Sequence, residues 1–151
     1  MTGREKKEHN DLFFVCSLIE YIGRKTKNHR DVVVNAIGKD KLQHIYDLAD
    51  VYHSDNIDKI TDELVEEFHI ATGSFDNVAD GKYLIPTHWD IGKVYKRLIV
   101  ALCDKHGKQT VDALVEVYNS WLSRKIEDFN SSLYYESPGY LYQSYIEGDV
   151  L

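Results

Sequence analysis

Two short segments each place a carboxylate and an imidazole three residues apart, so that both side chains share one face of a helix. They are DVYH (Asp50–His53) and EEFH (Glu66–His69). Di-iron helical bundles use Glu-x-x-His pairs of this kind, together with inward-facing glutamates from two further helices. The pattern predicts, as one alternative, a metal-dependent hydrolytic enzyme. Its candidate ligands are Asp50, His53, Glu66, His69 and His88.

The same residues also have a simpler interpretation as exposed residues at helix ends. His53 and His69 both fall near the ends of expected helices, and one pair has Asp where di-iron bundles have Glu. Among the other expected helices, only Glu20 offers an inward-facing carboxylate. The remainder of the sequence implies no cofactor.

Motifs of nucleophilic catalysis and nucleotide binding are absent. The chain contains no G-x-S-x-G elbow, no Walker A loop and no G-x-G-x-x-G segment. Its two cysteines, Cys16 and Cys103, lie within apolar helical stripes, where thiols are expected to be free, buried and unreactive. No catalytic residue is predicted, and a non-enzymatic role is favoured over an enzyme.

Residues 31–53 have the outline of a helix-turn-helix, with a short helix, a turn at Gly38 and a second helix that begins at Lys39. The second helix continues to Asp47 and Asp50, which phosphates would repel. A pI of about 5.4 is also opposite to that of most DNA-binding domains. A DNA-binding regulator is therefore a further alternative, and nucleic acid is the less favoured partner. Its candidate contacts are Lys39, Lys41, Gln43 and His44.

Charge is arranged in blocks along the chain, whose formal net charge is −7. Residues 24–44 contain six basic and two acidic residues, whereas residues 47–80 contain ten acidic residues and a single lysine. Residues 81–108 are basic again. Blocks of opposite sign can orient a protein partner, or they can neutralise one another inside the fold. The sequence leaves both interpretations open.

Aromatic residues are concentrated near the C-terminus, where residues 131–145 contain five of the eleven tyrosines. Tyrosine and tryptophan offer large amphipathic surfaces with few rotatable bonds, and they are enriched at protein interfaces. The leading hypothesis is a non-catalytic protein–protein interaction or regulatory module. Alternatively, the tyrosines fold back and close the helical bundle. The proposed contact surface combines residues 71–86 with Trp89, Tyr134, Tyr135, Tyr140, Tyr142 and Tyr145.

The elements that must position these residues are helices. Only Pro86 and Pro138 interrupt the chain, and the apolar residues recur every three to four positions. This periodicity predicts an all-α fold, a single bundle of six or seven helices in one domain that covers residues 1–151. The expected helices are 10–23, 32–37, 39–53, 57–68 after the cap residues Ser54 and Asp55, 88–106 after a capping box at Thr87–Asp90, 110–129 and 139–146.

Residues 71–86 break the helical pattern. Their Asp80-Gly81 pair predicts a small β-hairpin, with residues 75–78 against residues 82–85. A connection of this length is often functional when it is ordered. It also offers a boundary between two subdomains, which is the alternative to one bundle.

The sequence predicts a cytoplasmic protein without membrane contact. No apolar run approaches the roughly 20 residues that cross a bilayer. The N-terminal segment MTGREKKEHND is charged and lacks the apolar region of a signal peptide. A homo-oligomer is compatible with this sequence.

Two stretches, PTHWDIGKVYKRLI (Pro86–Ile99) and DFNSSLYYESPGYLYQ (Asp128–Gln143), resemble a family of small uncharacterised helical proteins from anaerobic bacteria. The segment from Leu12 to His53 resembles short helical proteins predicted to accompany bacterial toxins. The resemblance implies a small helical bacterial protein with no assigned activity, and it carries over no catalytic residue.

Overall fold

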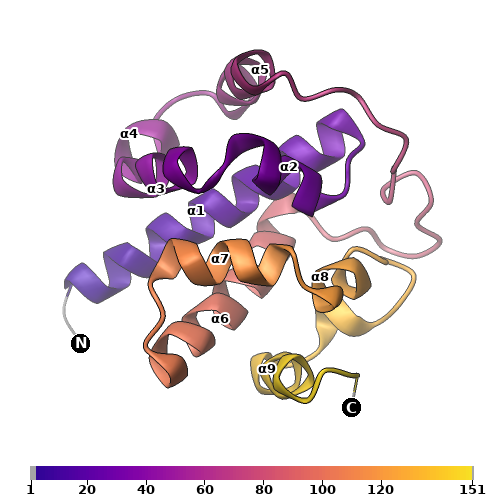
Figure 1. The fold of residues 1–151 in the computed structure, drawn as a ribbon. Coiled ribbons are helices and arrows are strands. Elements are labelled where there is room, and N and C mark those ends of the chain that lie inside the picture. Colours follow the sequence, from indigo (N-terminus) through magenta and orange to yellow (C-terminus); the bar gives the residue numbers. More distant parts are fainter. Residues whose placement is uncertain (1–2, 151) are drawn as a thin grey trace.

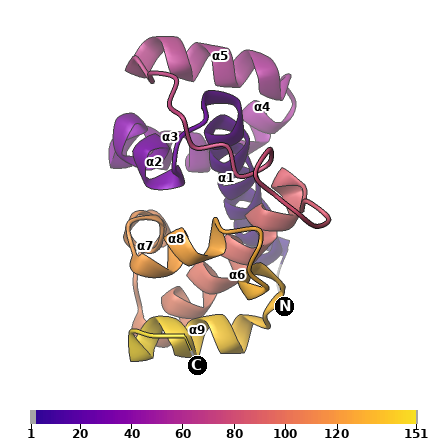
Figure 2. The same cartoon turned by 90° about the vertical axis from the view of Figure 1, so that its right-hand side faces the viewer.

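Helix α1 (Gly3–Thr26) runs through the middle of the molecule, between two groups of helices (Figure 1). In this computed structural model, which describes residues 3–150, most apolar side chains of α1 from Leu12 to Ile22 are almost completely buried. A helix that is apolar on most of its circumference needs neighbours on several sides, because one neighbour covers only one stripe. Figure 2 shows the two groups above and below α1.

The first group comprises α2 (Arg30–Ile37), α3 (Lys39–Asp47), α4 (Ala49–His53) and α5 (Ile57–Phe68). The second group comprises α6 (His88–His106), α7 (Thr110–Tyr118), α8 (Trp121–Ile126), the 3₁₀ turn η1 (Leu133–Tyr135) and α9 (Pro138–Glu147). Helix α6 packs along α1 more extensively than any other pair of elements in the described chain.

Local sequence signals account for several helix ends. Thr87 and Asp90 form the expected capping box at the start of α6, and each side chain accepts a hydrogen bond from the other residue's backbone N–H. Gly107 ends α6 in a left-handed conformation with φ 66°. The N-cap of α5 is Asn56 rather than the expected Ser54 or Asp55, and its side chain accepts from two backbone N–H groups.

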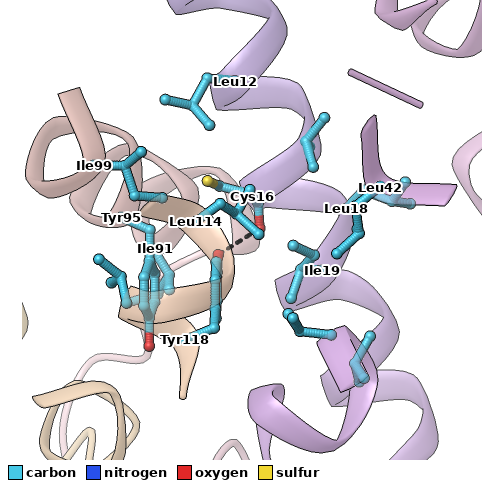
Figure 3. Packing of buried hydrophobic residues seen from close by; sticks show 14 of the residues in the cluster. Leu12, Cys16, Leu18, Ile19, Leu42, Ile91, Tyr95, Ile99, Leu114 and Tyr118 are labelled. Atoms are coloured by element: carbon cyan, nitrogen blue, oxygen red, sulfur yellow. Dashed lines mark hydrogen bonds between the residues drawn. The ribbon is translucent and has the colours of Figure 1, made fainter. Parts of the chain in front are cut away.

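One buried apolar cluster takes side chains from both groups of helices. In the part shown in Figure 3, the stacked rings of Tyr95 and Tyr118 lie 4.1 Å apart, and the Tyr118 hydroxyl donates to the backbone carbonyl of Cys16 (3.4 Å). Helices α1 and α6 meet closely at Gly92, where a Cβ atom would lie 2.1 Å from Ser17 Oγ. The absence of a side chain at Gly92 therefore permits this helix contact.

The all-α fold class is confirmed, but the expected number of six or seven helices is wrong. The described residues form nine α-helices, because two of the expected helices are each divided. The helix expected over 39–53 breaks at Leu48, and the one expected over 110–129 breaks at Asn119 and Ser120. The side chains of Asn119 and Ser120 donate to backbone carbonyls of α7 at 2.9 and 2.6 Å. Side-chain hydrogen bonds of this kind compete with helix continuation.

The expected β-hairpin at residues 75–85 is also wrong, since residues 71–86 contain no strand. Two backbone N–H groups bond to the end of α1, and the bonds from Asp80 N–H to the Asp76 carbonyl (3.0 Å) and from Gly81 N–H to the Val78 carbonyl (3.3 Å) close local turns. Gly73 N–H donates to the Thr26 carbonyl (2.8 Å), and Phe75 N–H donates to the Lys27 carbonyl (2.9 Å). The connection is an ordered loop that follows the end of α1.

Both cysteines are free, with Cys16 buried and Cys103 half-buried. Within residues 3–150, no helix has the length and apolar composition that a membrane span requires.

Candidate functional site

The C-terminal tyrosines do not form one continuous surface. Tyr134 is buried, and Tyr140, Tyr142 and Tyr145 are half-buried along α9, which packs against α6. Among the five, only Tyr135 is largely exposed. Most of this segment therefore covers the bundle, and Tyr135 remains accessible to a partner.

The tyrosines of α9 already have partners within the fold. The Tyr142 hydroxyl lies 2.8 Å from His106 Nε2, and the Lys105 ammonium lies 4.1 Å from the centre of the Tyr142 ring. Burial, followed by the nearby Glu116 carboxylate, raises the pKa of Tyr145 to about 12. These contacts hold α9 against the ends of α6 and α7.

A groove of about 470 Å³ opens beside Tyr135. It lies between the loop that leads into α6, the exposed side of α6 and the segment from η1 to the start of α9, and we call it the α6–α9 groove. Its lining is mainly apolar, with four charged residues. The lining residues are 84–87, Asp90, Lys93, Val94, Arg97, 134–136, Pro138 and Leu141.

The most exposed large apolar side chains of the described chain lie at this groove or next to it. They are Leu84, Tyr83 and Tyr135, which are 79%, 71% and 69% exposed. Single exposed apolar residues are ordinary, but several grouped beside a concave surface are typical of interaction sites. This combination marks the groove as the candidate site.

The two basic residues of the groove form no ion pair within the described chain. Lys93 and Arg97 are exposed and lie one helical turn apart on α6, and neither forms an ion pair with a residue of the described range. Burial and then the positive charges of Arg97 and Lys93 lower the pKa of the neighbouring Lys96. The Asp90 carboxylate accepts from the Thr87 backbone N–H at 2.9 Å, so it is engaged in the helix cap. The groove lining therefore offers two basic residues on α6 without an ion pair to any described residue, beside the carboxylates of Asp90 and Glu136.

Hydrogen bonds from several elements fix the loop that forms one wall of the groove. Arg24 donates to the Pro86 carbonyl (2.6 Å), and the Tyr134 hydroxyl donates to the Leu84 carbonyl (3.4 Å). The Asn130 side chain accepts from the Lys82 backbone N–H (2.8 Å) and donates to the Asp80 carbonyl (3.1 Å). The exposed Tyr83 and Leu84 thus stand on backbone that is held in place.

A buried charged network anchors the middle of the same loop. The guanidinium of Arg30, which has no solvent exposure, makes two hydrogen bonds to the Glu20 carboxylate at 2.9 and 2.7 Å. It also donates to Asn77 Oδ1 (3.1 Å), and Asn77 donates to the backbone carbonyl of Glu127 (3.1 Å). Arg30 crosses α1 at Gly23, where a Cβ would lie 2.4 Å from Arg30 Cδ. The network joins α1, α2, α8 and the loop.

The two buried carboxylates of the network differ in their ionisation. Burial raises the pKa of Glu20, but Arg30 and Arg24 lower it by more, so its pKa lies below the usual value. Burial raises the pKa of Glu127 above its usual value, and the Arg30 backbone N–H and the His29 ring oppose that shift only in part. His29 Nδ1 lies 3.2 Å from Glu127 Oε1. The Glu20–Arg30 pair is therefore the firmly charged part of the network.

Trp89 lies at a second concavity rather than at the α6–α9 groove. This concavity of about 470 Å³, which we call the Trp89 pocket, lies between α1, α4 and the start of α6. Asp50 and His53, two of the predicted metal ligands, line it as well. The lining residues are Lys7, Asn10, Asp11, Phe13, Phe14, Ala49, Asp50, His53 and Trp89.

The predicted metal ligands are not gathered into one site. Glu66 and His69 lie at the end of α5, where His69 is the left-handed C-cap residue. The His88 ring packs against Tyr21 and Trp89, with centroids 5.0 and 4.7 Å apart. Across residues 3–150, no three His, Cys, Asp or Glu side chains are arranged to hold a metal ion.

The predicted DNA contacts are occupied by acidic or neighbouring side chains. Lys39 pairs with Asp112 on α7, and Lys41 Nζ lies 3.6 Å from Glu67. Gln43 donates to Asp47 (2.9 Å). His44, the fourth predicted contact, packs edge-on against the Tyr52 ring (6.3 Å). The structure offers no specific observation in favour of groove insertion by α3.

Sequence patterns did not single out Tyr83, Leu84, Lys93 and Arg97, although the contact surface was expected to include residues 71–86. The local signals were an apolar pair directly before Pro86, in a segment without helical periodicity, and the basic block at residues 81–108. The buried Arg30 gave no signal, since arginine is rarely fully buried and its partners come from distant segments.

No protein-family model, curated protein or solved structure matches this chain. Its function is therefore inferred from the geometry of the site alone.

Proposed function

We propose that this chain is a protein-binding module, without catalytic activity of its own, that holds a short acidic and apolar segment of a partner protein in the α6–α9 groove. The carrying observation is the grouping of the most exposed large apolar side chains around this groove, on a loop fixed by hydrogen bonds. A binding surface that is already ordered loses less conformational entropy when the partner binds.

Two basic residues of the groove can pair with carboxylates of a partner segment. Lys93 and Arg97 face outward from α6 without an ion-pair partner in the described chain. A carboxylate of the bound segment can pair with either residue, while a large apolar side chain packs against Leu84 and Tyr135. Charge pairing of this kind mainly sets orientation and association rate, whereas apolar anchors supply most of the affinity.

Selection from a random peptide library on the immobilised wild-type protein tests this function. The enriched peptides are expected to combine a large apolar residue with Asp or Glu. Their affinities are then measured by fluorescence anisotropy for the wild type and for Leu84→Ala and Tyr135→Ala. Each substitution is expected to weaken binding by about tenfold or more, as removal of an apolar anchor does at other interfaces.

Charge and position controls make the test specific to the groove. Lys93→Glu with Arg97→Glu is expected to weaken acidic peptides and to remove most of the salt dependence of binding. Val51→Ala on α4 is the matched control, because Val51 is also a large apolar residue, 65% exposed, outside the groove. It is expected to leave affinity unchanged.

Three outcomes contradict the proposal. Selection that enriches no peptide excludes a general segment-binding groove. Enriched peptides whose affinity is the same for Leu84→Ala, Tyr135→Ala and Val51→Ala bind elsewhere. Enriched peptides without acidic residues, and with no response to charge reversal, overturn the assigned partner chemistry.

A further inference from the structure

The Trp89 pocket combines aromatic walls with two carboxylates from different helices. The Phe13 and Trp89 rings lie 5.5 Å apart, and the Phe14 ring meets the His53 ring edge-on at 5.4 Å. Asp11 comes from α1 and is nearly buried, whereas Asp50 comes from α4 and is exposed. The pocket is therefore apolar along its walls and acidic at one edge.

The two carboxylates already share a single ammonium group. Lys7 Nζ lies 2.8 Å from Asp11 Oδ2 and 3.3 Å from Asp50 Oδ2. Their spacing thus suits one cation with hydrogen-bond donors in more than one direction, as an –NH₃⁺ group has. Hydrogen bonds to Asp11 and Asp50 raise the pKa of Lys7, as expected for an ammonium held at an acidic site.

Another ammonium group can displace Lys7 from its position between the two carboxylates. Its side chain is 50% exposed, and ion pairs at exposed positions contribute little to stability. The pocket of about 470 Å³, which Lys7 itself lines, has aromatic walls that can accommodate an aliphatic stem. An ammonium near an aromatic face is attracted by the ring as well.

We propose that the Trp89 pocket binds an alkylammonium group, of the kind at the end of a lysine side chain, in exchange for Lys7. The ligand's ammonium occupies the position between Asp11 and Asp50, and its methylene chain lies along Phe13 and Trp89. An anionic ligand would be repelled by the two carboxylates. A neutral apolar ligand cannot replace the Lys7 ammonium between the two carboxylates, so it gains no ion pair there. This site is separate from the α6–α9 groove, so either one can fail without the other.

Tryptophan fluorescence reports on this site directly once the second tryptophan is removed. The chain has two tryptophans, and Trp121→Phe leaves Trp89 as the single reporter. In this background, N-acetyl-lysine-N′-methylamide and n-butylamine are expected to give saturable changes in Trp89 fluorescence at millimolar concentration. N-acetyl-norleucine-N′-methylamide, which has the stem without the charge, is expected to give none. A response to the lysine derivative alone assigns the site to lysines in polypeptides, and a response to butylamine alone assigns it to free amines.

The variants separate exchange at this pocket from nonspecific attraction to an acidic protein. Lys7→Ala removes the competing ammonium and is expected to raise affinity about two- to fivefold. Asp50→Asn is expected to lower it about two- to fivefold, because it removes one charged acceptor at an exposed position that the fold tolerates. Asp47→Asn, at an exposed position on α3 outside the pocket, is the matched control and is expected to have no effect.

The proposal is overturned if the norleucine derivative binds as well as the lysine derivative, or if neither amine gives a saturable response. It is also overturned if Lys7→Ala fails to strengthen binding, or if Asp47→Asn weakens binding as much as Asp50→Asn does.

Discussion

Replacement of Arg30 by methionine removes a fully buried guanidinium and leaves an apolar side chain of similar length. Glu20 then loses the two hydrogen bonds at 2.9 and 2.7 Å, but it keeps the bond from Arg24 Nε at 2.8 Å. The Asn28 carbonyl and Asn77 Oδ1 also lose the donors that lie 2.8 and 3.1 Å away in the wild type. The substitution therefore leaves the buried Glu20 carboxylate with Arg24 as its remaining cationic partner.

The expected loss of stability follows from this geometry. Removal of one partner from a buried ion pair destabilises proteins by about 3–5 kcal/mol. Because Arg24 still compensates Glu20, we expect a value at the lower end of that range, about 3 kcal/mol. A loss of this size is a large part of the roughly 5–15 kcal/mol by which single domains are stable. It also releases Asn77, so the loop that carries Leu84 is expected to become more mobile.

Urea unfolding followed by circular dichroism measures this loss, and a double-mutant cycle assigns it. Arg30→Met, Glu20→Met and the double variant are compared with the wild type. The double variant leaves no unpaired carboxylate at position 20, so its loss is expected to be smaller than the sum of the single losses by about 2 kcal/mol. A loss below about 1 kcal/mol in Arg30→Met, or strictly additive losses, would refute the buried pair as the anchor of the loop.

The pH dependence provides an independent check. In the wild type, the pKa of Glu20 is lowered in the folded state, so its contribution is present above the unfolded carboxyl pKa of about 4.3 and is lost as pH falls. In Arg30→Met, burial is opposed by Arg24 alone, and the folded pKa is expected to rise. Protonation of Glu20 then removes the poorly compensated negative charge, so Arg30→Met regains part of its lost stability at low pH. The difference in unfolding free energy between the two proteins is therefore expected to shrink as pH falls towards about 4.

Three further predictions concern the core and the network. Gly92→Ala places a Cβ 2.1 Å from Ser17 Oγ and 2.9 Å from Ser17 Cα, so urea unfolding should show a free energy of unfolding lower by about 1–3 kcal/mol. A variant as stable as the wild type would argue against this close helix contact. Burial raises the pKa of Glu127, so the wild type is expected to lose stability relative to Glu127→Gln as pH rises from the ordinary carboxyl range through that raised pKa. Thermal melts measure this, and melting temperatures of the two proteins that change with pH in parallel would contradict it. Burial raises the pKa of Cys16 to about 12 and also raises the pKa of the half-buried Cys103. Iodoacetamide should therefore label Cys103 slowly and Cys16 more slowly still in the folded protein, and mass spectrometry that finds Cys16 labelled at the unfolded rate would disprove its burial.

Part of the candidate site could be anticipated from local composition. The unusual segment 71–86 and the tyrosine-rich C-terminus were both expected to contribute contact surface, and Tyr135 and Leu84 do lie at the α6–α9 groove. Trp89 was expected on the same surface but faces a different pocket. Spacing along a helix gives the face on which a residue lies, but it does not say which neighbouring element covers that face.

The sequence alone determined the all-α class and several helix ends, because apolar spacing and capping act within a few residues. The capping box at Thr87 and Asp90 and the left-handed Gly107 are local features, and both occur where the residue types predict them. Only the tertiary structure decided the course of the loop and the position of Arg30. Each of these depends on partners far away in the chain, such as Glu20 and Asn77 for Arg30. A buried charge is stable only when folding brings such partners together, so no local pattern could have predicted the burial of Arg30.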